Sequence, residues 1–154
     1  MKRHGPRAAL IATLAMFAAA GCRGGTPDDE AIRALVAAQI AAIEQGDIAG
    51  FMEHVCDSYT DEAGRAPDEL RALLFGYLQR YGRPTVQSRV RDVEVVATDD
   101  APASATVEVA ALARSAAGAE GDVYVVTLGL VKPRGWCVRS AGWQSGSLTD
   151  LVAP

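Results

Sequence analysis

The chain has 154 residues, with 15 Lys and Arg against 19 Asp and Glu and a formal net charge of −4. This length suits one domain with a single hydrophobic core. The acidic balance and the lack of a basic stripe argue against nucleic-acid binding, which needs clustered cations to displace counterions. The same balance argues against a surface that binds anionic lipid by charge alone.

The first 21 residues have the composition of a secretion signal. Lys2, Arg3 and Arg7 precede a run of 13 small or apolar residues, interrupted only by Thr13, from Ala8 to Ala20. As a helix this run would cover about 20 Å, too short for the hydrocarbon core of a bilayer, which is about 30 Å thick. A cationic start, a short apolar centre and small residues at its end are typical of a signal peptide.

The end of this run, Ala19-Ala20-Gly21-Cys22, resembles the lipobox of bacterial lipoproteins, although that family usually has Leu where this chain has Ala19. In that family the chain is cut just before the cysteine, whose sulfur receives a diacylglycerol. The resemblance therefore implies lipidation of Cys22 by acyl chains such as palmitate, with residues 1–21 removed. The following Arg23 implies the outer membrane, facing the periplasm. The alternatives are an ordinary signal peptide cut near Ala20 or an uncleaved N-terminal anchor.

Three helices are predicted after a short tether over residues 22–27. Apolar residues at three-and-four spacing give each helix one buried face. Caps and breakers bound these helices: Thr26, Pro27, Gly46, Asp47, Pro67 and Gly82. The polar stretch over residues 56–66, between the second and third helices, is predicted to be a loop.

From Thr85 onward the apolar spacing becomes strand-like and predicts four antiparallel strands over residues 86–97, 105–113, 123–132 and 136–144. The first changes parity midway, which indicates a bulge near Arg91 and Asp92. The third is apolar on both faces, as a central strand is. Three helices followed by four strands give an α+β domain over residues 28–145, with a tail over residues 146–154.

Two motifs resemble the nuclear transport factor 2-like superfamily, the SnoaL-like or cystatin-like α+β roll. Gly46-Asp47 within residues 43–51 is similar to its helix–break–helix corner, and Gly135-Trp136-Cys137-Val138 with Trp143 is similar to its closing strand. The resemblance spans residues 28–144. It implies three N-terminal helices packed on a curved four-stranded antiparallel sheet that leaves a cone-shaped pocket. The superfamily includes isomerases, cyclases and dehydratases, and many members without catalysis.

Cys56 and Cys137 form an even pair once Cys22 is lipidated. An oxidising envelope permits a disulfide between them, which would stabilise the fold by about 2–4 kcal/mol. The alternative is two buried thiols that act as small apolar side chains.

Few residues in the chain offer reactive chemistry. An isomerase-like site needs a carboxylate base in an apolar pocket and a hydroxyl or acid opposite it. Asp57, Asp61 and Tyr59 are weak candidates, because they follow the second helix in a polar stretch where carboxylates are mostly solvated. Other side chains that could line a pocket are Tyr77, Tyr124, Arg114 and Trp143. After residue 21 only His54 remains as a histidine, and no metal or cofactor motif is recognised.

These patterns favour a lipid-anchored cell-envelope protein with a non-catalytic domain that binds a small apolar ligand or a protein partner. A second hypothesis is an isomerase- or cyclase-like enzyme that uses Asp57 or Asp61 as the base. A third is a structural subunit of an envelope complex, with a homodimer formed through the sheet. All three expect membrane attachment through the N-terminal lipid, no cofactor, no metal and no nucleic acid.

Overall fold

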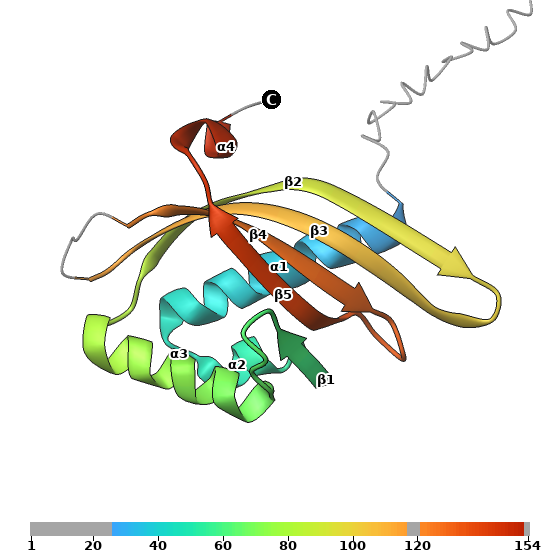
Figure 1. The fold of residues 1–154 in the computed structure, drawn as a ribbon, viewed down its shortest axis with the longest axis horizontal. Helices are drawn as coiled ribbons and strands as arrows, with labels where there is room; N and C mark the ends of the chain where they lie inside the picture. The colour runs from blue at the N-terminus through green and yellow to red at the C-terminus, as the bar shows by residue number, and fades with distance from the viewer. Residues whose placement is uncertain (1–25, 117–120, 153–154) are drawn as a thin grey trace, which may run out of the picture.

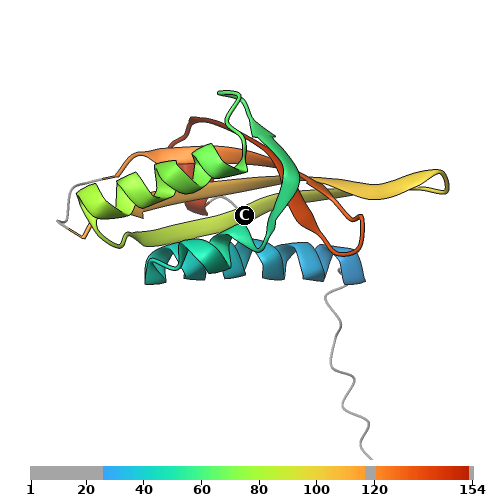
Figure 2. The same ribbon diagram turned by 90° about the horizontal axis from the view of Figure 1, so that it is seen from below.

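The computed structural model describes residues 26–116 and 121–152, so Cys22 and the predicted signal peptide lie outside the described residues. In chain order the elements are α1 (Pro27–Gln45), α2 (Ile48–Met52), β1 (Val55–Asp61), α3 (Pro67–Tyr81), β2 (Thr85–Thr98), β3 (Ala101–Arg114), β4 (Val123–Val131), β5 (Cys137–Ser145) and α4 (Leu148–Val152). The sheet curves over α1, and α3 lies below it beside α2 (Figures 1 and 2). The predicted α+β class is confirmed.

The sheet has five strands in the order β1-β5-β4-β3-β2. Strand β1 pairs in parallel with β5, and the other neighbours are antiparallel. The prediction of a loop over residues 56–66 is therefore wrong for Val55–Asp61. Its polar residues Asp57, Ser58 and Thr60 face solvent, whereas Cys56, Tyr59 and Asp61 are buried.

Caps form as the sequence predicts at both ends of α1. The Thr26 hydroxyl accepts a hydrogen bond from the Asp29 backbone N–H at 3.2 Å. Gly46 closes the helix with φ +74°, a left-handed conformation that glycine adopts without steric cost. Asp47 then caps α2 by accepting from the Gly50 backbone N–H at 2.9 Å.

The four strands predicted over residues 86–97, 105–113, 123–132 and 136–144 are present as β2, β3, β4 and β5, with ends that differ by up to four residues. The pairing of β2 with β3 shifts register between Val90 and Asp92, where the parity change predicted a bulge. Strand β4 lies between β5 and β3, in the interior of the sheet. Its two apolar faces follow from this position.

The main core forms where α1 packs on the inner face of the sheet. Ile32, Leu35 and Val36 of α1 meet a buried layer of strand residues: Tyr59, Ala105, Val107, Val109, Leu130 and Val138. Ile32, Leu130 and Val107 are the largest fully buried side chains. Burial of such apolar side chains contributes roughly 1.5–3 kcal/mol each, so this contact holds the helix under the sheet.

The first turn of α1 is fixed to the connection between β4 and β5. The Asp28 carboxylate accepts hydrogen bonds from Lys132 Nζ at 2.6 Å and from Trp136 Nε1 at 3.0 Å. These bonds lower the pKa of Asp28. Trp136 packs against the main core, so the Asp28 contacts secure the end of the domain from which the chain leads to residue 22.

A disulfide and the C-terminal helix make further contacts that hold the sheet together. A disulfide joins Cys56 of β1 to Cys137 of β5, with the Cα atoms 5.2 Å apart. Helix α4 lies on the face of the sheet opposite α1, where a tail without regular structure was expected (Figure 1). The Gly146 backbone N–H donates to the Val123 carbonyl at 2.7 Å, and Asp150 pairs with Arg91 at 3.3 Å.

Within the described ranges, none of the helices has the length and apolar character needed to cross a membrane.

Candidate ligand-binding cavity

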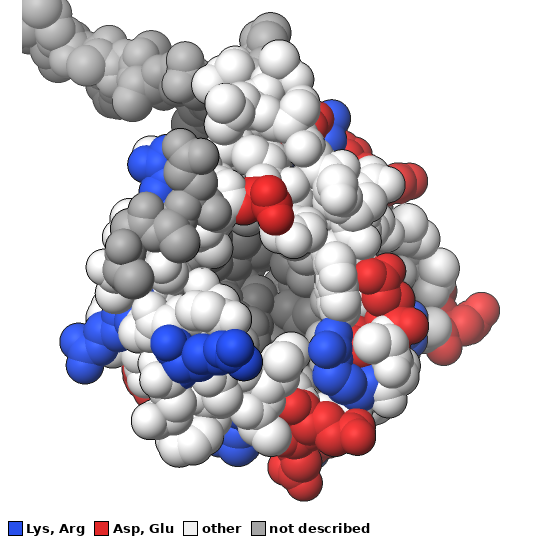
Figure 3. Space-filling view, turned by 60° about the vertical axis from the view of Figure 1, so that its left-hand side comes forward, with Lys and Arg blue, Asp and Glu red and all other residues white. Residues whose placement is uncertain are grey.

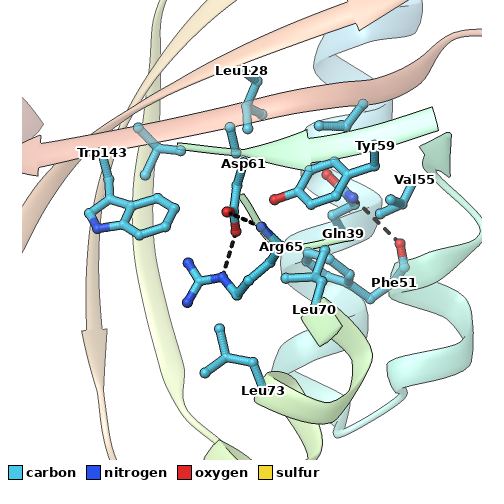
Figure 4. Close-up of a pocket in the computed structure, with 13 residues that line it drawn as sticks. Gln39, Phe51, Val55, Tyr59, Asp61, Arg65, Leu70, Leu73, Leu128 and Trp143 are labelled. Carbon is cyan, nitrogen blue, oxygen red and sulfur yellow. Dashed lines mark hydrogen bonds and ion pairs between the residues drawn. The ribbon is translucent and has the colours of Figure 1, made fainter. Parts of the chain in front are cut away.

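A cavity of about 360 Å³ lies between the helices and the inner face of the sheet (Figure 4). Small-molecule sites usually occupy about 300–1,000 Å³, so this volume suits a small ligand. Apolar side chains from five elements make up most of the wall: Phe51, Val55, Leu70, Leu73, Val126, Leu128, Val138 and Ala141. Gln39, Tyr59, Asp61, Arg65 and Trp143 complete it.

The molecule is visibly hollowed on the side where α3 ends (Figure 3). Among the described residues around this hollow, positive and negative side chains are interspersed and neither sign dominates. The rim therefore offers no broad field that would attract ions of one charge.

Asp61 is the buried carboxylate of the cavity wall, with 7% of the residue exposed. It ends β1, and its side chain organises the turn that follows. Oδ1 accepts hydrogen bonds from the backbone N–H groups of Ala63 and Arg65, both at 3.0 Å. Oδ2 accepts from Arg65 Nε at 2.7 Å. Aspartate is favoured in such turns because its side chain can bond to backbone N–H groups a few residues ahead.

These bonds decide the protonation state of Asp61. Burial on its own would raise the pKa of the carboxyl group, but the backbone N–H and guanidinium of Arg65 and the N–H of Ala63 hold that pKa below its usual value. The carboxylate is therefore ionised and paired at neutral pH. A general base works best when its pKa lies near the working pH, so Asp61 is poorly suited to abstract a proton.

Arg65 places its charged end in the cavity wall beside Trp143. Its guanidinium carbon lies 5.0 Å from the centre of the Trp143 ring, within the range of a cation–π contact. The arginine side chain is 26% exposed, and its outer nitrogens point away from Asp61 (Figure 4). A guanidinium has five N–H donors, and among the described residues only Nε–H is hydrogen-bonded.

Tyr59 supplies a second polar group to the same wall. Burial, followed by the negative charge of Asp61, raises the pKa of Tyr59 to about 12. Its hydroxyl points toward Asp61 in Figure 4. The phenol thus keeps its proton at neutral pH and can donate a hydrogen bond.

Gln39 reaches the cavity from the buried face of α1. Its Nε2 donates to the Phe51 carbonyl of α2 at 3.4 Å, which ties the two helices together below the cavity. Neither Gln39 nor Arg65 is predicted from the sequence as a site residue. The available signals were the position of Gln39 four residues after Leu35 on the buried face, and the i, i+4 spacing of Asp61 and Arg65.

The structure brings together only some of the predicted site residues. Tyr59, Asp61 and Trp143 share the cavity. Asp57 is exposed in a separate hollow of about 730 Å³ beside the Cys56–Cys137 disulfide. Tyr77 and Tyr124 line another hollow at the end of α3.

Two further site predictions concern Arg114 and metal ions. Arg114 is exposed at the end of β3. In the part of the chain that the structure describes, no group of three or more His, Cys, Asp or Glu side chains is placed to hold a metal ion.

No protein-family model matches the chain, and no curated protein matches it. Solved structures do resemble it. A domain with a cystatin-like fold from Nostoc punctiforme has a TM-score of 0.64 at 16% identity, with 80% of each chain covered. A ketosteroid isomerase-like protein from Erwinia carotovora has a TM-score of 0.59 at 18% identity, with 80% of this chain and 99% of that chain covered.

Bd1075 of Bdellovibrio bacteriovorus is similar over 78% of this chain, with a TM-score of 0.63 and 14% identity. The match spans 41% of that longer protein. At these identities the likeness shows the fold alone. The fold is the cystatin-like roll that the two sequence motifs resemble, which defines a class of helix-backed, curved-sheet domains.

Proposed function

We propose that this protein is a lipid-anchored cell-envelope protein whose cavity binds a small, mainly apolar ligand without chemical conversion. The observation that carries the proposal is the state of Asp61, the carboxylate in the cavity wall. Three hydrogen bonds engage its two oxygens, and its pKa is lowered. An apolar hollow whose acid is already paired is better suited to hold a molecule than to move its protons.

A second candidate is a proton-transfer enzyme, and one observation favours it. Tyr59 and Asp61 lie in one cavity, an arrangement that an isomerase-like reaction needs. Likeness to the ketosteroid isomerase-like protein is consistent with it. Catalysis would first require Asp61 to break its ion pair with Arg65. A variant that lacks the Arg65 charge should therefore be more active if the protein is an enzyme. The same variant should show no activity if the protein only binds a ligand.

Ligand binding can be tested with N-phenyl-1-naphthylamine, an uncharged fluorescent probe. We expect saturable binding to the wild-type protein and about tenfold weaker binding to Leu73→Trp, because the larger side chain narrows the cavity. Phe75→Trp is the matched control on the same helix. Leu73 and Phe75 are 47% and 57% exposed, but only Leu73 lines the cavity. Absence of saturable binding, or equal effects of both variants, would contradict the proposal.

Anchoring is tested separately at Cys22. Labelled palmitate should enter the full-length protein in a bacterial host, and the protein should fractionate with membranes. Cys22→Ala should abolish both. Labelling that persists in Cys22→Ala would disprove the assigned attachment site.

A further inference from the structure

The cavity wall has more hydrogen-bond donors than acceptors available to a ligand. Asp61 already accepts three hydrogen bonds. Arg65 keeps its outer N–H groups without a hydrogen-bond partner among the described residues, whereas the Tyr59 hydroxyl is turned toward Asp61. A ligand that satisfies these donors must carry an acceptor oxygen.

The charges of the wall nevertheless do not favour an anion. Arg65 and Asp61 form an ion pair of zero net charge, with Nε and Oδ2 2.7 Å apart. Glu62 adds another carboxylate nearby, because its Oε1 accepts from the Trp143 backbone N–H at 3.3 Å. An anionic ligand would lose its hydration without gaining an uncompensated cation, which is unfavourable in an apolar site.

We propose that the cavity selects an uncharged molecule, an apolar body with an acceptor oxygen such as an ester, over the matching carboxylate, and that Asp61 sets this selectivity by neutralising Arg65. This inference rests on the proposed function, since it assumes that the cavity binds a ligand. Without the Asp61 charge, Arg65 would lose its only ion-pair partner among the described residues. Its planar pair of outer nitrogens matches a carboxylate, so the preference should then move toward the anion.

The test uses methyl 2-naphthoate and 2-naphthoate, which share one apolar body, in equilibrium dialysis at neutral pH. The wild-type protein should bind the ester at least about tenfold more tightly than the anion. Asp61→Asn should bind the anion at least about tenfold more tightly than the wild type does. Asp57→Asn is the matched control: it removes the same charge from an exposed residue of β1 outside the cavity and should leave both affinities unchanged.

Each outcome assigns success or failure to one proposal. Equal affinities of the wild type for both probes, or equal effects of Asp61→Asn and Asp57→Asn, overturn the charge selectivity. Binding of N-phenyl-1-naphthylamine without binding of either naphthoate also overturns it and leaves the proposed function in place. Failure of all three probes removes the proposed function itself. If Asp61→Asn does not fold, the wild-type ratio of ester to anion still decides whether the cavity selects the uncharged molecule.

Discussion

At the scale of single residues, Tyr59 shows how position changes chemistry. It occupies an inward position of an edge strand and lies beside a buried, ionised carboxylate. Both surroundings penalise the phenolate, and its pKa rises to about 12. The same residue type on a solvent-facing helix position would lack both effects.

Tyr59 therefore predicts a loss of stability in alkaline solution. Between the unfolded pKa of about 10 and the folded value of about 12, the folded state binds the Tyr59 proton and the unfolded state has released it. The free energy of unfolding should thus fall as the pH rises through this window. Urea unfolding from pH 9 to 12 measures it, and Tyr59→Phe should show a shallower decline. Identical slopes for both proteins would contradict this account.

The sequence shows which side chains are available for a site, but it predicts less well which neighbours surround each of them in the fold. Asp61 was a candidate because of its place after the second helix, yet its partner Arg65 depends on the turn geometry that the Asp61 side chain itself creates. Trp136 and Trp143 are seven residues apart, a spacing that predicts opposite faces of an ideal strand. Trp136 packs against the core and Trp143 borders the cavity. Both rings thus lie on the inner side of the sheet, because the pairing of β5 shifts register between Val138 and Ser140. Periodicity alone could not place them, and the convergence of five elements on one cavity has no local sequence signal.

At the scale of elements, the strands in which apolar residues alternate clearly could be predicted from the sequence, and β1 could not. The bulge in β2 shifts the apolar parity once, so it could be located from the sequence. In β1 the pairing with β5 is irregular: Val55 is opposite Val138, but Thr60 is opposite Ser140. Between these two pairs β1 advances by five residues while β5 advances by two. The apolar residues of β1 therefore do not alternate as they would in a regular strand. Its pairing depends on a partner more than 75 residues away.

Two helix glycines predict opposite responses to the same substitution. Gly46→Ala should lower stability by about 1 kcal/mol, because Gly46 ends α1 at φ +74° and an added Cβ would meet Arg83 Nε at 3.2 Å. Gly76→Ala should raise stability by about 0.5–1 kcal/mol, because Gly76 is exposed within α3 and an added Cβ meets no atom within 4 Å. Thermal or urea unfolding measures both. Changes of the same sign would contradict this reading of the two sites.

At the scale of the whole molecule, the Cys56–Cys137 disulfide holds the edge strand against β5 across 81 residues of sequence. A cross-link over a long loop stabilises mainly by restricting the unfolded chain, and natural ones contribute about 2–5 kcal/mol. The double variant Cys56→Ser with Cys137→Ser should lose stability in this range. Reduced wild-type protein is the control and should unfold at the same urea concentration as the double variant. No difference between oxidised and reduced protein would show that β1 is held by its other contacts.

The contacts of Asp28 also fix the position of the first turn of α1 within the domain. Asp28, Lys132 and Trp136 secure the start of α1 at one end of the molecule. The end of α3 lies at the other end of the molecule (Figures 1 and 2), beside the hollow lined by Tyr77 and Tyr124. A protein tethered ahead of α1 would therefore present the hollow lined by Tyr77 and Tyr124 at the end of the domain farther from its attachment point.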